Sequence, residues 1–237
     1  MHTVMKNAVA IIPARGGSKR IAKKNIKSFF GKPLIAYSIE TALKSELFEK
    51  VIVSTDDEEI AKIARDYGAI VPFIRPKELS DDFTTTNDVI EHAINYLKEY
   101  DKKYDFICTI YATAPFLQVK YLKQGLDKLK NSDAINSFST TTMPFPIQRT
   151  FKVNNDGRCE MFYPQYYETR SQDLEMAYQD AGQFYWKKET MKSEKNLFSR
   201  DSIAIILPRY LVQDIDTLED WTQAELMYEV LKKSNKI

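Results

Sequence analysis

Short apolar runs of strand length alternate with amphipathic helical patterns along most of the chain. Strands are expected at residues 8–12, 51–55, 70–74, 106–111, 134–139, 182–186 and 203–207, and helices at 33–43, 56–67, 84–100, 121–129 and 218–233. Strands that alternate with helices are joined by right-handed crossovers and form a mostly parallel sheet with helices on both faces. Because Pro13 has no N–H, pairing of the first strand is expected to stop there. The pattern predicts one α/β domain over residues 1–237.

Residues 140–180 depart from this alternation with an aromatic and polar stretch. Met143–Ile147 contains two prolines, and Tyr163, Tyr166 and Tyr167 follow. Exposed aromatic side chains there would form either a patch covered by another subunit or a floor for a substrate. A satellite core of packed aromatic rings is the alternative. We interpret this stretch as an inserted segment that leaves the main core.

The composition shows no strong charge bias. The 34 basic and 33 acidic residues give a net charge of +1, which argues against wholesale binding to nucleic acid or to a membrane surface. No apolar stretch is long enough to span a bilayer, and the N-terminus lacks the apolar region of a signal peptide, so we expect a cytoplasmic protein. Cys108 and Cys159 have no metal or disulfide spacing, and we expect buried thiols in a reducing compartment.

Histidine is scarce in this chain. His2 and His92 are too few and too poorly placed for a zinc site or for most hydrolase triads. Any metal chemistry must therefore use carboxylates. His92 lies within a helical pattern, where a partly buried structural role is expected.

The loop after the first strand combines a glycine pair with a group of cations. Gly16 and Gly17 free the backbone to turn its N–H groups toward an anion, and the loop carries the cations Arg15, Lys19, Arg20, Lys23 and Lys24. The spacing matches neither the G-x-G-x-x-G fingerprint nor the P-loop. A solvated basic turn is the alternative, but fusion to a buried strand favours a polyphosphate site. Ser54–Asp57 and Ala112–Pro115 also follow strands, where ligands of such sheets bind.

Five motifs carry a resemblance to a known family. They are the basic loop, Arg75-Pro-x-Glu-Leu79, Ala112-Thr-Ala-Pro115, Arg170-x-Gln172 and Asp214-Ile-Asp216. In order and spacing the chain resembles, nearly end to end, the acylneuraminate cytidylyltransferases, which make CMP-activated nonulosonic acids. Tyr111–Phe116 together with Asp180–Trp186 is most similar to the branch that acts on pseudaminic acid. The sialic acid branch typically carries Gln-Pro-Thr-Ser-Pro where this chain has Tyr111–Pro115, and the family often has proline at the position of Ala22.

The resemblance implies a Rossmann-like α/β domain with a swapped dimerisation arm built from the segment after residue 140, and hence a homodimer. It implies transfer of CMP from CTP to the anomeric hydroxyl of a nonulosonic acid, with release of pyrophosphate. Pseudaminic acid is the substrate it favours. Sialic acid, legionaminic acid or a 3-deoxy sugar acid are the alternative substrates, and a nucleotide-binding protein without turnover is the alternative of another class.

The resemblance and the residue types together give a set of candidate site residues. The nucleotide is expected to contact Ala14, Arg15, Gly16, Gly17, Ser18, Lys24, Asn25, Arg75 and Thr86. The sugar is expected to contact Tyr111, Thr113, Arg170, Gln172, Tyr178 and Phe184, with Arg170 and Gln172 reaching the neighbouring subunit's site. The expected catalytic residues are Arg15, Lys19, Asp214 and Asp216.

The implied reaction needs positioning and charge neutralisation more than covalent help from the protein. Arg15 and Lys19 would hold the β and γ phosphates. Asp214 and Asp216 alternate along an extended segment, so they face the same side and suit one Mg²⁺. A helix-capping role for Asp216 is the alternative. Asp56 and Asp57 compete as metal ligands but have a sufficient role at a helix start. The acceptor of the hydroxyl proton stays open between the metal site and one aspartate of the pair.

Overall fold

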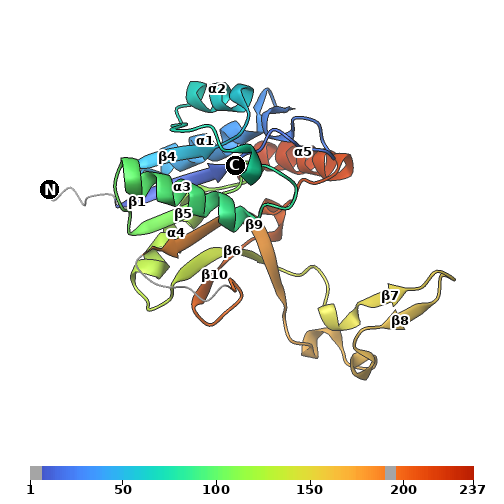
Figure 1. The fold of residues 1–237 in the computed structure, drawn as a ribbon. Coiled ribbons are helices and arrows are strands. Elements are labelled where there is room, and N and C mark those ends of the chain that lie inside the picture. The colour runs from blue at the N-terminus through green and yellow to red at the C-terminus, as the bar shows by residue number, and fades with distance from the viewer. Residues whose placement is uncertain (1–6, 190–195) are drawn as a thin grey trace.

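A six-stranded sheet forms the centre of the structure (Figure 1). The structure is a computed structural model that describes residues 7–189 and 196–237, so His2 lies outside the described residues. The strand order is β10-β6-β9-β5-β1-β4. The strands are β1 (Ala8–Pro13), β4 (Lys50–Ser54), β5 (Phe106–Ile110), β6 (Asn136–Thr142), β9 (Tyr178–Lys188) and β10 (Ser202–Leu207). Of these described strands only β9 runs antiparallel to its neighbours, which confirms the predicted mostly parallel sheet.

Helices cover both faces of the sheet, as the pattern predicts. They are α1 (Leu34–Ser45), α2 (Glu58–Asp66), α3 (Thr86–Tyr100), α4 (Val119–Lys130) and α5 (Leu218–Lys233). Side chains alternate along β1 between two clusters because a strand has a period of two. Ala10 and Ile12 pack in the cluster that contains α1, α2 and α4, whereas Val9 and Ile11 pack against α3. In Figure 1, α3 crosses in front of the sheet.

The short elements are β2 (Ser28–Phe29), β3 (Lys32–Pro33), β7 (Phe151–Val153) and β8 (Cys159–Met161), with 3₁₀ turns at Lys24–Ile26, Lys77–Leu79, Ile147–Arg149, Pro164–Tyr166, Ser171–Asp173 and Arg209–Leu211.

The helix α5 is held on α1 by aromatic rings. Phe29 makes edge contacts with Tyr37, Trp221 and Tyr228 at centroid distances of 5.5, 5.5 and 5.3 Å. This packing fixes where the segment that leads into α5 lies.

Two expectations about strand pairing are wrong. Residues 70–74 form only isolated bridges, from Ile70 to Ile52 and from Ile74 to Thr55, because Pro72 between them cannot donate to a ladder. Pairing also continues past Pro13, since the N–H of Ala14 donates to the Ser54 carbonyl at 3.0 Å. Successive N–H groups of a strand point to opposite neighbours, so the missing donor of Pro13 falls on the β5 side, where the pairing ends at Ile11.

The two thiols differ in exposure. Cys108 is buried in β5, as expected, and burial raises the pKa of its thiol. The expectation that Cys159 is buried is wrong, because it lies exposed on β8. The two cysteines are free, which agrees with the absence of a disulfide framework in the sequence.

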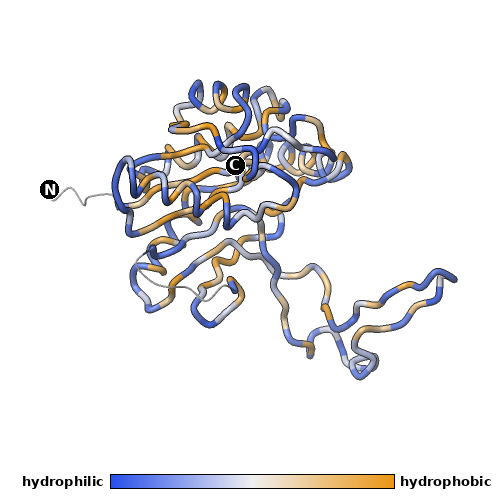
Figure 2. Tube along the Cα trace, in the orientation of Figure 1, coloured by the Kyte–Doolittle hydropathy of each residue, from blue (hydrophilic) through white to orange (hydrophobic). Residues whose placement is uncertain are grey.

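Residues 143–177, here called the arm, leave the sheet between β6 and β9 and carry the β7–β8 hairpin away from the domain (Figure 1). Hydrophobic residues recur along the arm as well as in the strands (Figure 2). The exposed ones include Phe145, Phe151, Val153, Phe162, Tyr167 and Met176. The alternative of a packed satellite core is therefore wrong, and the arm presents its apolar side chains outward.

Gly125 provides a test of the packing between α4 and the sheet. A methyl group at this position would lie 2.9 Å from Trp186 Cδ1 and 3.0 Å from Phe184 Cε2, and both rings are fully buried. Glycine to alanine in a helix interior ordinarily stabilises by about 1 kcal/mol. We expect Gly125→Ala instead to destabilise by about 1–3 kcal/mol, because the rings have no room to move. Measured by denaturant unfolding, the free energy of unfolding of Lys123→Ala, an exposed change on the same helix, should lie near that of wild type. A more stable Gly125→Ala protein would show that the interface is loosely packed.

Candidate functional site

A cleft of about 370 Å³ opens at the carboxyl ends of β1 and β5. It is lined by the basic loop, by the segment that leads into α3, and by the residues after β5. The predicted residues that line it are Arg15, Ser18, Lys19, Lys24, Asn25, Arg75, Thr86, Tyr111, Thr113 and Asp216. Side chains as far apart in the sequence as Arg15 and Asp216 thus meet where a parallel sheet places its ligands.

Other predicted residues lie outside this lining. Ala14 is buried, Gly17 is exposed, and Asp214 lies next to Asp216, which lines the cleft. Phe184 belongs to the main core with no exposed surface, so its predicted sugar contact is not supported by its position. Its neighbour Tyr185 faces the other side of β9 and packs on Tyr111 at a centroid distance of 5.2 Å.

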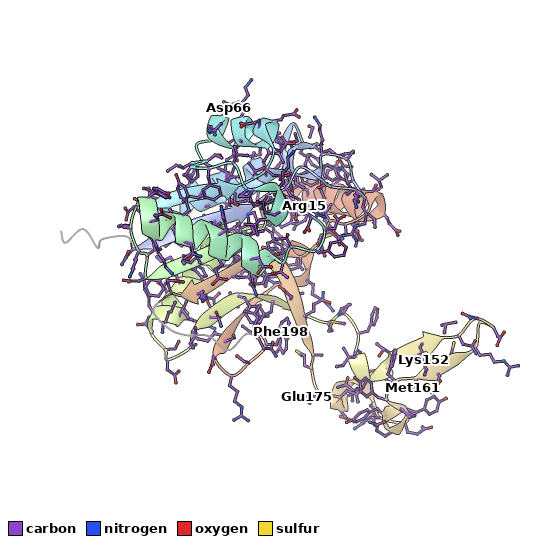
Figure 3. The ribbon with its side chains drawn as sticks, in the orientation of Figure 1. Arg15, Asp66, Lys152, Met161, Glu175 and Phe198 are labelled. Atoms are coloured by element: carbon purple, nitrogen blue, oxygen red, sulfur yellow. The ribbon has the colours of Figure 1, made fainter. Side chains whose placement is uncertain are left out.

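The predicted sugar contacts of the arm are remote from the cleft of the same chain. Arg170 and Gln172 lie on the arm, and Tyr178 begins β9 where the arm returns to the sheet. Arg170 is exposed and pairs with Asp173 at 2.8 Å. Figure 3 shows Arg15 on the α/β domain, well apart from Lys152 and Met161 of the arm. Within one chain these residues do not meet the cleft.

The start of the basic loop is fixed by polar contacts with the rest of the domain. Asn25 donates from Nδ2 to the Arg15 carbonyl at 2.9 Å, and the Gly16 N–H donates to Asp56 Oδ1 at 3.0 Å. The prediction that the Gly16 N–H faces a ligand is therefore wrong, because it is already used. Glycine is required at position 16 because a Cβ there would lie 2.6 Å from Asp57 Oδ2. Asp57 itself caps α2, as expected, accepting from the N–H groups of Glu59 and Ile60.

Asp82 is a cleft residue that the sequence analysis missed. Its carboxylate accepts from Arg15 Nη1 at 2.9 Å and pairs with the Lys19 ammonium group. Hydrogen bonds from Lys19 and Arg15 hold the pKa of this exposed carboxyl group below its usual range. The two cations are thus turned toward one point of the cleft, and a polyanion that enters competes with Asp82 for them. The only sequence signal was an acidic pair, Asp81-Asp82, close behind the Arg75 motif.

The acidic pair near the C-terminus faces the cations of the basic loop. Asp216 pairs with Arg20 Nη2 at 2.9 Å and with Lys24 Nζ at 3.1 Å. It is not the helix cap, because Thr217 caps α5 in a reciprocal arrangement with Asp220. Partial enclosure raises the pKa of Asp214, and the charge of Asp216 raises it further. The charge of Lys24 acts in the opposite direction and lowers the pKa of Asp214.

This donor set fits a magnesium ion better than a transition metal. Within the described parts of the chain, no group of three or more His, Cys, Asp or Glu side chains gathers as a metal site. Mg²⁺ needs one or two protein carboxylates and completes its shell with phosphate oxygens and water. Asp214 and Asp216 flank the buried Ile215, so they can offer two such oxygens beside the cations Arg20 and Lys24 of the basic loop.

The fold and the cationic cleft define an α/β enzyme that handles a phosphorylated nucleotide. The profile of the cytidylyltransferase family matches residues 9–233, and the chain therefore belongs to this family of nucleotidyltransferases. It is 46% identical over 231 residues to a pseudaminic acid cytidylyltransferase of Campylobacter jejuni, covering 97% of this chain and 99% of that protein. It is 32% identical over 232 residues to an N-acylneuraminate cytidylyltransferase of Escherichia coli, covering 96% of this chain and 53% of that protein.

A solved structure shares the fold. The CMP-2-keto-3-deoxy-manno-octonic acid synthetase complexed with CTP superposes with a TM-score of 0.65 at 15% identity, covering 94% of this chain and 98% of that one. The predicted family and fold class are confirmed by these findings. No helix in the described ranges is long and apolar enough to cross a membrane.

The two loop glycines offer a matched test of the site geometry. Gly16→Ala is expected to push the loop away from Asp57, lowering the free energy of unfolding by about 1–3 kcal/mol. The same displacement should weaken nucleoside triphosphate binding by at least about tenfold. A Cβ at Gly17 would meet nothing within 4 Å, so the free energy of unfolding of Gly17→Ala should lie within about 0.5 kcal/mol of that of wild type. Denaturant titration and calorimetry measure both effects. Equal stability of the two variants would contradict the close packing of the loop on Asp57.

Proposed function

We propose that this enzyme transfers the CMP group of CTP to the anomeric hydroxyl of a nonulosonic acid and releases pyrophosphate, with pseudaminic acid as the sugar. One observation carries the proposal. The cations Arg15, Lys19 and Lys24 and the carboxylate of Asp216 converge on one cleft, in a chain that matches a pseudaminic acid cytidylyltransferase over nearly its whole length. The lower identity to the N-acylneuraminate enzyme supports pseudaminic over sialic acid.

The residues of the cleft divide into two ends. Arg15, Lys19 and Lys24 form the phosphate end, and Arg75 with Thr86 forms the cytidine end, as the family resemblance implies. The sugar hydroxyl attacks the α-phosphorus in line, the bond to the bridging oxygen of the β-phosphate breaks, and the electron pair leaves on pyrophosphate. Guanidinium and ammonium groups stabilise that departing charge when they already face the cleft, as Arg15 and Lys19 do. Tyr111 and Thr113 would contact the acceptor sugar.

Mg²⁺ is part of this proposal. Asp214 and Asp216 would hold it, and bound there it would neutralise phosphate charge. A cation at the pair would also lower the raised pKa of Asp214 again, which keeps both carboxylates charged. Asp216, which pairs with Lys24 and Arg20, would supply one of the two carboxylates to the ion.

The arm supports a homodimer. Its outward apolar residues are of the kind that a second copy covers, and Arg170 and Gln172 are too far from the cleft of their own chain to contact its ligand. We infer that the arm of each subunit supplies these two residues to the site of its partner, where a guanidinium group suits the sugar carboxylate. The two free cysteines fit a reducing compartment, and we assign the reaction to the cytoplasm.

The direct test of the function is pyrophosphate release from CTP in magnesium buffer with each candidate sugar in turn. Release is expected with pseudaminic acid, together with a CMP-sugar detected by mass spectrometry. Faster release with sialic or legionaminic acid would reassign the substrate within the family. CTP binding without release for every sugar would favour the non-catalytic alternative.

Arg15→Ala and Asp216→Ala are each expected to lower kcat by about 10²–10³ while the fold is kept, because both side chains lie at an accessible ligand site. The Asp216 variant should also require more Mg²⁺ for its half-maximal rate. Matched controls are Arg65→Ala and Asp66→Ala, exposed changes of the same charge on α2, away from the cleft. Rates near wild type for Arg15→Ala or Asp216→Ala would remove that residue from the mechanism.

The composite site makes a subunit-mixing experiment decisive. Arg15→Ala inactivates the cleft of its own chain, whereas Arg170→Ala would inactivate the cleft of the partner. After refolding as a mixture, heterodimers should regain one intact site, giving about one quarter of wild-type activity. Light scattering should show twice the chain mass of 27.5 kDa. A monomer with full activity would refute the shared site, as would a mixture no more active than its components.

A further inference from the structure

Arg75 is the most enclosed cation of the cleft. Its side chain is only 2% exposed, although it lines the cleft that receives the ligand. Nε donates to Ser80 Oγ at 3.1 Å, and Nη1 lies 3.4 Å from the Ser54 carbonyl. Burial lowers the pKa of this guanidinium, and the nearby charge of Arg15 lowers it further. A charge enclosed in this way requires a counter-charge to remain in place.

Asp56 supplies that counter-charge. Its Oδ1 atom lies 3.4 Å from Arg75 Nη2, and its charge raises the pKa of the guanidinium against the effect of burial. Among residues 7–189 and 196–237 it is the one carboxylate that pairs with Arg75. The carboxylate is partly buried, which limits the screening of this pair by solvent. Arg75 is therefore held in the cleft by Asp56.

The same oxygen holds the basic loop. Oδ1 of Asp56 also accepts the Gly16 N–H at 3.0 Å, at the point where the loop leaves β1. Gly16 and Arg75 come from segments with no shared strand, and each contacts the end of β4. The backbone N–H groups of Ala14 and Arg75 donate to the carbonyl groups of Ser54 and Thr55 at 3.0 and 2.8 Å, and the one carboxylate oxygen of Asp56 adds a side-chain link between the phosphate end and the cytidine end of the cleft.

We propose that Asp56 is a positioning residue that sets the Arg75 guanidinium and the Gly16 turn in one arrangement before CTP binds. This inference rests on the proposed function for the identity of the nucleotide. Asp56 acts through its two partners rather than on the reacting atoms. Its loss should weaken the fit of the triphosphate and the cytidine together and should leave the chemical step nearly unchanged.

Two substitutions separate the two contacts. Asp56→Asn keeps an oxygen that accepts the Gly16 N–H but removes the negative charge that faces Arg75. Asp56→Ala removes both the acceptor oxygen and the negative charge. We expect the KM for CTP to rise about tenfold in Asp56→Asn, the scale of one lost charge-assisted hydrogen bond, and further in Asp56→Ala. The kcat should stay within about threefold of wild type in Asp56→Asn. Asp57→Asn is the matched control, because asparagine caps a helix as well as aspartate and the change in charge is the same.

A double substitution tests whether Asp56 works through Arg75. Adding Asp56→Asn to Arg75→Met should change the KM for CTP little beyond the effect of Arg75→Met alone. Fully additive effects would overturn the coupling. A fall in kcat with an unchanged KM in Asp56→Asn would indicate a merely structural role and would overturn the proposal. A higher Mg²⁺ requirement in the same variant would indicate that Asp56 is a metal ligand and would overturn it as well. If wild type itself binds no CTP by calorimetry, the proposed function fails instead.

Discussion

The position of β1 between β4 and β5 is the constraint on which the cleft depends. Residues 9–13 pair with β4 and residues 8–11 pair with β5, both in parallel, and residues 8–12 are buried, so the strand has almost no freedom of placement. The loop that follows must therefore begin beside the ends of β4 and β5. For this reason Asp56 after β4 contacts the loop and Tyr111 after β5 lines the same cleft, and the glycine at position 16 allows the close approach of the loop to Asp57.

Charge organises the cleft as much as packing does. Each cation of the basic loop has an acidic or carbonyl partner from another segment: Arg15 and Lys19 meet Asp82, and Lys24 meets Asp216 and the Ile215 carbonyl at 2.5 Å. These partners offset the repulsion among the cations of the basic loop, so the loop keeps its conformation before a ligand binds. The pairs of Arg15 and Lys19 with Asp82 are exposed and therefore weak in water, so a multivalent anion can replace Asp82 at small cost. The arrangement is suited to binding and releasing a polyphosphate.

Periodicity predicted the helices best where one face is buried at a spacing near 3.6 residues, as in α2, α3 and α4. The strands β1 and β4 were predicted instead from short continuous apolar runs, because both are buried almost throughout. Motifs brought Arg15, Arg75 and Asp216 to one cleft correctly. The face of β9 on which each side chain lies was not predictable. Phe184 lies in the core and Tyr185 lies on the opposite face, against Tyr111. The sequence alone does not show which face of that strand packs in the core. The roles of Asp82 and Asp56 depend on partners distant in the chain, which spacing alone does not reveal.

The strand order has a consequence for synthesis on the ribosome. β1, β4 and β5 emerge first and can pair at once, but the other edge of β5 waits for β9, which is made only after the arm. Until then the nascent chain carries an open strand edge next to a hydrophobic face, the feature through which partly folded chains associate. β9 also joins β6 and β10 to the rest of the sheet, so closure of the sheet is a late event that brings distant segments together. Chaperone demand during production of this protein should therefore centre on the interval before residues 184–188 of β9, which pair with β5, are made.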